Sequence, residues 1–230
     1  MEDKSRFMML DCLRGLGIVL MIIFHFTYDL HFLRIVDVPF ISHFLWQNFA
    51  RFIASLFLIC AGMGLALVHK KGIQWGHLKK RFLRIGVWAL IITAATYYYM
   101  PKNFIFFGIL HCIAVSSILG AFFVKRPAIC LLLSLLLVIP NMIFQPTFIP
   151  IVKWFGVVSA DYIPLYPWFG LFLLGIYFES IHIHRIPLKR SRFTKSFQFL
   201  GKHSLKIYLL HQPILFGILN TLLYFTRSQV

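Results

Sequence analysis

The sequence predicts an all-α fold: a polytopic membrane bundle of about seven transmembrane helices, with a cytoplasmic N-terminus and an extracytoplasmic C-terminus. Three observations lead to this prediction. Of the 230 residues, 60% are hydrophobic and only 13% are charged. The apolar runs are too long and too frequent for the core of a water-soluble domain. The basic residues, finally, are concentrated in alternate connecting segments.

Seven apolar segments have the length that a bilayer core requires. In chain order they are residues 9–30, 45–68, 83–101, 104–124, 128–145, 165–181 and 204–225. The fifth and sixth are the shortest and contain Pro140 and Pro167. The first segment continues well past a typical signal-peptide core, and no small-residue cleavage site follows it, so we expect it to remain as an anchor.

The distribution of Lys and Arg sets the predicted orientation. With the N-terminus inside, 15 of the 23 basic residues fall in cytoplasmic segments and 4 in outer segments, and the other four lie within predicted spans. This asymmetry satisfies the positive-inside rule. The net charge of +16 is therefore a topology signal and a means of binding anionic lipid, and nucleic acid is not an expected partner.

Residues 1–230 are expected to form a single domain, since the chain shows no internal repeat and no low-complexity tract. Two basic loops, 69–85 and 182–203, alternate charged with aromatic or aliphatic residues. Such a loop can rest on anionic headgroups or bind a polyanionic cytosolic cofactor. The four cysteines (Cys12, Cys60, Cys112 and Cys130) lie inside predicted spans without the spacing of a zinc site. We expect them to be packing residues, and we expect no metal.

The first span carries ionisable residues that need a reason to be in a membrane. Asp11, Arg14, His25 and Asp29, together with Tyr28, fall within one arc of about 100° on a helical projection, so this polar stripe should face the bundle interior. Asp11 and Arg14 are one turn apart, which favours a structural ion pair. His25 and Asp29 are spaced i, i+4, and a carboxylate one turn from an imidazole can orient it as a general base.

Three further polar residues lie at a similar predicted depth: Arg51, His111 and His211. A buried Arg needs a carboxylate or a substrate anion, and Asp29 is the nearest candidate by depth. Each His is open to two interpretations, a hydrogen-bonded packing residue or a group that contacts substrate.

Several blocks of the chain resemble a known family. They are LDCLRGLGIVLMIIFHFTYDL (10–30), ARFIASLFLICAGMGLAL (50–67), FGILHCIAV (107–115), DYIPLYPWFGLFLLG (161–175) and LGKHSLKIYLLHQPIL (200–215). Together they resemble the catalytic domain of the heparan-alpha-glucosaminide N-acetyltransferase family and its short bacterial relatives, over nearly the whole chain. The first and last blocks also resemble larger membrane acyltransferases that O-acylate cell-surface sugars.

The resemblance implies transfer of an acetyl or other acyl group from cytosolic acyl-CoA to a sugar amine or hydroxyl on the far side of a membrane. The acceptor would be an envelope glycan or a lipid-linked sugar, and the membrane a bacterial inner membrane. On this basis the candidate catalytic residues are His25, Asp29 and His43. The candidate substrate-binding residues are Arg51, His111, Asp161, Trp168 and His211, and those for acyl-CoA are Arg14, Lys79, Lys80 and Arg81.

The chain departs from the family pattern in two respects. Eukaryotic members have Asn at the position of His25 and carry the His regarded as catalytic in the loop after the first span. Here that loop offers His31 and His43, of which His43 is the better match by spacing. The chain is also shorter and lacks the large lumenal domain, which argues against heparan as its substrate.

Two other functions remain open at this stage. A transporter or flippase could use the polar stripe as a proton relay. A transmembrane redox protein could bind haem between His25 and His111. The sequence also leaves three points open. They are the identity of the acyl group, the choice between direct transfer and an acyl-histidine, and the oligomeric state, including a homodimer.

Overall fold

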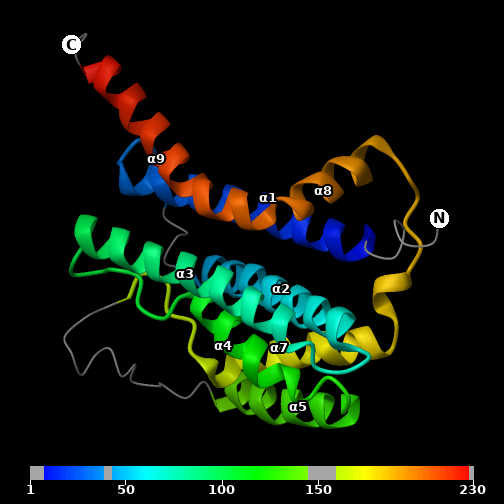
Figure 1. Ribbon diagram of the computed structural model, residues 1–230. Helices are drawn as coiled ribbons and strands as arrows, with labels where there is room; N and C mark the ends of the chain where they lie inside the picture. Colours follow the sequence, from blue (N-terminus) through cyan, green and yellow to red (C-terminus); the bar gives the residue numbers. More distant parts are fainter. Residues whose placement is uncertain (1–7, 39–42, 145–158, 228–230) are drawn as a thin grey trace. The chain divides into compact units, whose positions relative to one another are not determined.

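The computed structural model describes residues 8–38, 43–144 and 159–227, and this part of the chain forms helices joined by loops, with no strand. It divides into two compact units (Figure 1). The first unit comprises Met1–Phe57 and Arg185–Val230, and the second comprises Leu58–His184. Helix α2 (Phe44–His69) contributes its first half to one unit and its second half to the other. The prediction of an all-α fold is confirmed.

In the first unit, α8 (Arg192–Lys202) and α9 (Ser204–Arg227) both pack on α1 (Met8–Phe32). Ile18 and Met21 of α1 and Ile53 of α2 form a small buried core. Phenylalanines of α1 and α2 and apolar residues of α9 cover this core. The contact aligns the polar stripe of α1 with α9.

Glycines allow α1 and α8 to meet backbone to backbone. A Cβ atom on Gly201 would collide with the Asp11 carbonyl oxygen, and one on Gly15 would collide with the Phe197 carbonyl oxygen. Helix α8 begins at a capping box, in which the Ser191 hydroxyl accepts from the Thr194 N–H at 3.1 Å and the Thr194 hydroxyl accepts from the Ser191 N–H at 2.9 Å. A well-capped helix is thus held against the first turns of α1.

In the second unit, the described residues form the rest of α2 and four further α-helices. They are α3 (Trp75–Tyr99), α4 (Ile109–Ala121), α5 (Pro127–Phe144) and α7 (Leu165–Ser180), and a short 3₁₀ helix, η2 (Ile183–Arg185), follows. Helix α7 packs on α5 and α4, and α3 packs on α4. Gly62 of α2 faces the Phe172 carbonyl, and Gly175 of α7 faces the Ile59 carbonyl, so α2 and α7 also meet through glycine.

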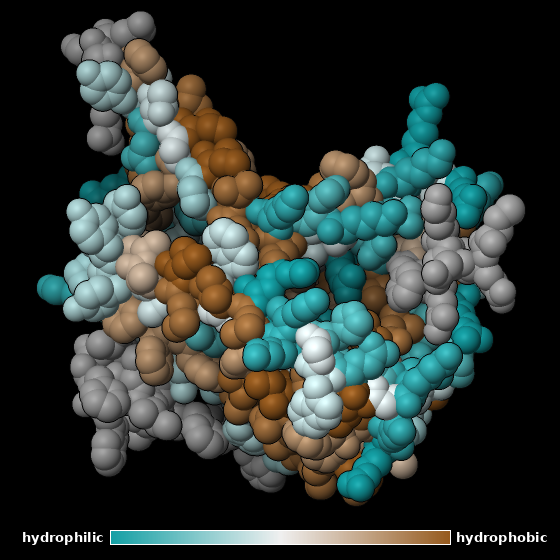
Figure 2. Space-filling view, in the orientation of Figure 1, coloured by the Kyte–Doolittle hydropathy of each residue, from teal (hydrophilic) through white to brown (hydrophobic). Residues whose placement is uncertain are grey.

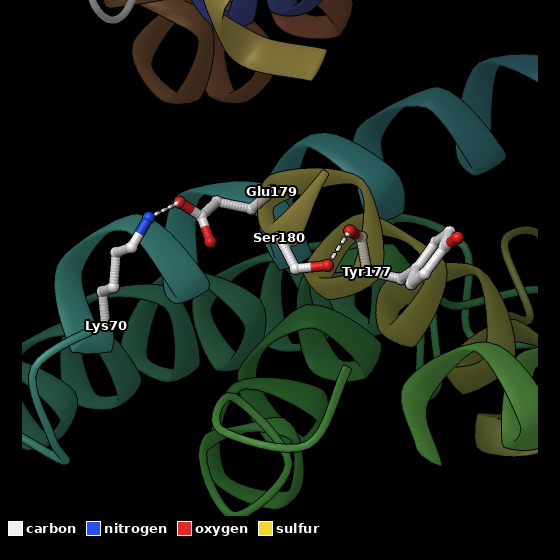
Figure 3. Close-up of polar contacts among 4 residues, drawn as sticks. All are labelled: Lys70, Tyr177, Glu179 and Ser180. Carbon is white, nitrogen blue, oxygen red and sulfur yellow. Dashed lines mark hydrogen bonds and ion pairs between the residues drawn. The ribbon is translucent and has the colours of Figure 1, made fainter. Parts of the chain in front are cut away.

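An ion pair joins the ends of α2 and α7 (Figure 3). Lys70 Nζ lies 3.3 Å from Glu179 Oε1, and the exposed fractions of the two side chains are 43% and 6%. Beside it, the Ser180 hydroxyl donates to the Tyr177 carbonyl at 2.7 Å and satisfies one of the last acceptors of α7. The buried Glu179 carboxylate therefore has a cationic partner that reaches it from solvent.

Within the part of the chain that the structure describes, four helices are long and apolar enough to cross a membrane: α1, α2, α3 and α9. Helices α4 and α5 are shorter apolar helices. Large apolar side chains are exposed on α3 and α9, among them Leu90 and Leu222. Figure 2 shows hydrophobic residues over α9 and hydrophilic ones along much of α8. The prediction of long apolar helices is confirmed, and four of the expected spans have, within the described residues, the length that a bilayer requires.

Three predicted boundaries differ from the structure. Most of the predicted basic loop 69–85 belongs to α3, which begins at Trp75, because Lys, Leu and Arg are good helix formers. The predicted loop 182–203 contains α8. Helix α4 begins only at Ile109, because Phe107 has a φ of 52° and ends the preceding segment in a left-handed conformation.

Replacing Gly201 by Ala tests the contact between α1 and α8. The added methyl group meets the Asp11 carbonyl, so we expect the free energy of unfolding to fall by roughly 1–3 kcal/mol, the usual cost of overpacking. Gly217→Ala in α9 is the matched control, because nothing lies within 4 Å of its added Cβ. Thermal unfolding in detergent measures the two effects. Equal stability of the two variants would contradict the close contact.

Candidate functional site

The contact between α1 and α9 brings Asp29 together with Gln212. Gln212 Nε2 donates to Asp29 Oδ1 at 2.7 Å, and Asp29 is only 1% exposed. A carboxylate buried in a helix contact needs such a donor, because no bulk water is present to replace it. We call Asp29 and Gln212 the acid–amide pair.

One turn before Asp29, the ring of His25 lies against the ring of His211. The two ring centroids are 4.9 Å apart, and the ring planes are inclined at 57°. We call these residues the histidine pair. Both pairs join the same two helices, and their members are one turn apart on α1 and adjacent on α9. Of the predicted residues, the structure thus brings His25, Asp29 and His211 together.

The backbone of α9 fixes the proton position of His211. Its Nδ1 lies 2.7 Å from the Tyr208 carbonyl oxygen, which can only accept. In the neutral imidazole the proton is therefore on Nδ1, and Nε2 carries the free lone pair. His211 is 9% exposed. A buried imidazole held in this tautomer is prepared to accept a proton or a hydrogen bond at Nε2.

Three buried polar atoms of this cluster have no hydrogen-bond partner among the described residues. They are Asp29 Oδ2, His211 Nε2 and Gln212 Oε1. Buried polar atoms are nearly always paired with protein or water, so a group of three in one helix contact marks a place where water or a ligand can donate hydrogen bonds. The described residues also provide no hydrogen bond to His25, whose contacts are with aromatic rings.

The geometry differs from the expected arrangement of His25 and Asp29. The sequence spacing predicts that the carboxylate orients the imidazole, but Asp29 Oδ1 accepts from Gln212, and the described structure has no hydrogen bond between Asp29 and His25. Sequence analysis did not select Gln212. The available signal was an amide beside His211 within an apolar span, in the stretch LLHQPIL.

The other predicted residues of the first unit have local partners. Arg14 Nη1 lies 3.4 Å from Asp11 Oδ1, which is the expected structural ion pair. Arg51 is exposed and donates to Asn48 Oδ1 at 3.4 Å, with no ion pair to Asp29 in the described structure. His43 is exposed just before α2, where its Nδ1 accepts from the Leu45 N–H at 3.3 Å. None of these three contacts joins them to the histidine pair.

In the second unit, Asp161 closes the N-terminus of α4. Its Oδ2 accepts from the Ile109 N–H at 3.2 Å. Gly108, the N-cap residue, has no side chain to do this, and a Cβ there would meet Asp161 Oδ2 at 2.8 Å. Burial raises the pKa of Asp161, and the Ile109 N–H opposes that shift by stabilising the carboxylate. A capping role accounts for this contact.

His111 and Trp168 lie near the starts of α4 and α7. The Thr93 hydroxyl donates to the Ile105 carbonyl at 2.7 Å, so its oxygen can accept from His111 Nε2, 3.4 Å away. Trp168 is partly buried in the first turn of α7. His111 thus has the hydrogen bond that is expected of a packing residue. Its role in substrate binding stays a prediction.

The three cationic residues at the start of α3 differ in orientation. Lys79 and Lys80 are exposed. Arg81 turns inward, donating from Nε to the Ser117 hydroxyl at 3.1 Å and from Nη2 to the Ala61 carbonyl at 3.0 Å. Lys79 and Lys80 are therefore free to meet an anion, whereas Arg81 links α3 to α4 and α2. The described residues contain no group of three His, Cys, Asp or Glu side chains placed to hold a metal.

Comparison with models of known protein families shows to which family the chain belongs. The family model described as heparan-alpha-glucosaminide N-acetyltransferase, catalytic, matches residues 6–213. The chain belongs to this family. Its membership confirms the resemblance seen in the sequence and places the chain among membrane N-acetyltransferases. No curated protein and no solved structure matches it.

Substitution of Asp161 separates capping from substrate binding. Asp161→Ala removes the acceptor for the Ile109 N–H, and we expect it to lower the free energy of unfolding by about 1 kcal/mol. Asp161→Asn keeps an oxygen at this position and should retain most of the stability. Thermal unfolding and acetyl transfer are measured on both variants. A stable Asp161→Asn protein without transfer activity would favour the substrate-binding role.

Proposed function

We propose that this protein transfers an acetyl or other acyl group from cytosolic acyl-CoA to a sugar amine or hydroxyl on the outer side of a membrane. The observation that carries the proposal is the histidine pair, of which His211 is buried, beside the acid–amide pair, in a chain that belongs to an N-acetyltransferase family. The acceptor is an envelope glycan or a lipid-linked sugar. The membrane is the inner membrane of a bacterium, and residues 1–230 act as one catalytic domain.

In this reaction His25 is the general base. The acceptor nitrogen or oxygen forms a bond to the acyl carbon, and the bond from that carbon to sulfur breaks. The proton of the acceptor goes to an imidazole and then to the departing thiolate, which leaves as free thiol. His211, held with its Nε2 lone pair free, can take the proton from His25 or polarise the acyl carbonyl when protonated. Asp29 stabilises the positive charge that develops nearby.

The acyl donor is a polyanion, and the chain offers exposed cations for its phosphates. Lys79 and Lys80 at the start of α3 have the accessibility that such a role needs. Arg14 is a weaker candidate, because Asp11 already neutralises it. The same lysines could instead attract anionic lipid headgroups, with α8 as a second basic, aromatic surface that exposes Phe193 and Phe199.

We further propose seven spans with a cytoplasmic N-terminus. The 15-to-4 distribution of basic residues between alternate segments supports this orientation. The shorter helices α4 and α5 and the 16-residue α7 would complete the seven. A short hydrophobic helix can be accommodated by local thinning of the bilayer.

Replacing the histidines tests the proposed chemistry. His25→Ala should lower the rate of acetyl transfer about 10²- to 10⁴-fold, the usual contribution of a general base. His211→Ala should also lower it, and Asp29→Asn should cost less, because it removes charge but no proton acceptor from the histidine pair. Transfer of radiolabelled acetyl from acetyl-CoA to amino sugars measures the rates, with unfolding temperature as a check on folding.

His43→Ala tests the alternative taken from the family pattern. If His25→Ala transfers acetyl at near the wild-type rate while His43→Ala does not, the loop residue carries the chemistry. If no His substitution matters, the cluster between α1 and α9 is not an acyl-transfer site, and the transporter function gains support.

The double variant Lys79→Gln, Lys80→Gln tests donor binding. Loss of two phosphate contacts should weaken acetyl-CoA binding about tenfold or more, measured by calorimetry. Arg81 is left unchanged, because its hydrogen bonds to α2 and α4 would make its loss a folding defect. Unchanged affinity, with reduced binding to anionic vesicles, would assign these lysines to lipid headgroups.

Labelling of single introduced cysteines tests the topology. In a background without the four native cysteines, a membrane-impermeant thiol reagent should reach Cys at position 230 from outside the cell. It should reach Cys at position 72 only in inverted vesicles. Labelling of both positions from the same side of the membrane would contradict the seven-span topology.

A further inference from the structure

Helix α8 turns one face to α1 and leaves the other face exposed. On the inner face, Gly201 meets the Asp11 carbonyl. At about 100° per residue, four residues of the exposed face fall within an arc of about 80°. They are Arg192, Lys195, Phe199 and Lys202. Three cations thus flank one aromatic ring, and that ring belongs to a side chain that is 61% exposed.

The segment around α8 is basic and contains no acid. Between Arg185 and Lys206 the chain has seven Lys and Arg residues, all of them exposed, and it has no Asp or Glu after Glu179. None of the ion pairs among the described residues includes one of the seven. Their positive charge therefore attracts an anion from outside the chain.

The start of α8 strengthens this attraction. The positive end of the helix dipole lies there and favours acidic side chains, but the first turn of α8 has none. Arg192 and Lys195 instead lie among its first four residues. Cations at this end oppose the dipole, and an external anion would stabilise both the helix terminus and the side chains.

The neighbours of α8 indicate where such an anion would be met. Helix α9 begins at Ser204, directly after the end of α8, and is apolar and long enough to cross a membrane. The inner face of α8 lies on the first turns of α1, which is another such helix. A helix between the ends of two candidate spans lies at the depth of lipid headgroups. The exposed Phe193 and Phe199 fit this depth, because aromatic side chains there enter the boundary with the acyl chains, whereas an anion dissolved in water would not need them.

We infer that the exposed face of α8 binds anionic phospholipid, with Arg192 and Lys195 on the headgroup phosphates and Phe199 in the boundary with the acyl chains. This lipid site is separate from the histidine pair and requires none of the proposed transfer chemistry. It holds the junction of α8 and α9 at the membrane surface, and His211 lies two turns further along α9.

The probes for a test are dioleoyl-phosphatidylglycerol and dioleoyl-phosphatidylcholine, which have the same acyl chains and differ in net charge. Native mass spectrometry of the full-length protein in neutral detergent measures the affinity for each lipid. One variant combines Arg192→Gln with Lys195→Gln, and another is Phe199→Ser. The matched control combines Lys125→Gln with Arg126→Gln, which removes two exposed cations from a loop of the second unit.

We expect the wild-type protein to bind phosphatidylglycerol about tenfold or more tightly than phosphatidylcholine. The double variant of α8 should lose most of this preference, because each Lys or Arg near an anionic lipid surface contributes a factor of about five. Phe199→Ser should weaken the binding of both lipids about threefold or more, since its burial does not depend on the headgroup. The control should keep the wild-type preference within about twofold, and acetyl-CoA affinity should be unchanged in the α8 variants.

Three results would overturn the inference. The first is equal affinity of the wild-type protein for the two lipids, a comparison that needs no variant. The second is an equal loss of preference in the α8 double variant and the control, which would indicate general attraction to a basic protein. The third is weaker acetyl-CoA binding with unchanged phosphatidylglycerol binding in the α8 double variant, which would assign these cations to the acyl donor. Lipid preference without any acetyl transfer would refute the proposed function and leave the lipid site in place.

Discussion

The hydrogen bond between Asp29 and Gln212 is the constraint on which the first unit depends. A carboxylate that is 1% exposed in a membrane helix can be tolerated only where another element supplies a donor. This requirement fixes which face of α1 meets α9. Because His25 precedes Asp29 by one turn and His211 is adjacent to Gln212, satisfying the carboxylate also brings the two imidazoles together.

The polar residues at the two ends of the stripe on α1 find their hydrogen-bond partners in different ways. Near the start of the helix, Asp11 and Arg14 pair with each other, and the backbone there is covered by α8 at Gly201. Near the other end, Asp29 finds a donor for only one of its oxygens, and neither its second oxygen nor the neighbouring His211 Nε2 is paired by the described residues. Asp11 and Arg14 thus have their partners within α1, as expected of a structural ion pair. The Asp29 cluster needs further donors, from water or a ligand.

The sequence predicted the long apolar helices well, because hydrophobicity over some 20 residues is a local property. Predicted spans 9–30 and 204–225 correspond to α1 and α9 within a few residues. Sequence analysis assigned the residues of α8 to a basic loop, because an 11-residue amphipathic helix has a composition similar to that of a polar loop. Helical periodicity predicted the inward face of α1 correctly for Asp11 and Asp29, which are buried, but not for Tyr28, which is 43% exposed.

The roles of single polar residues were less accessible to sequence analysis. Asp161 caps a helix that begins 52 residues earlier in the chain, and Gln212 binds a carboxylate 183 residues away. Such pairings depend on the tertiary fold, and no local pattern encodes them. Arg81 looked equivalent to Lys79 and Lys80 by sequence, yet the rotation of α3 directs it toward Ser117 and Ala61. Charge type was thus predictable, whereas the direction in which each charge points was not.

Glycine contacts account for two other helix contacts of the protein, α1 with α8 and α2 with α7. Within a bilayer the hydrophobic effect no longer drives helices together, and close van der Waals packing through small residues takes over. Gly62 and Gly175 provide this packing between α2 and α7, and Gly15 and Gly201 allow the same close approach of α8 to α1. Helix contacts of this kind require neither a histidine pair nor an acid–amide pair. The contact between α1 and α9 has both, and the cost of such polar groups within apolar helices is best explained by the chemistry that we propose for them.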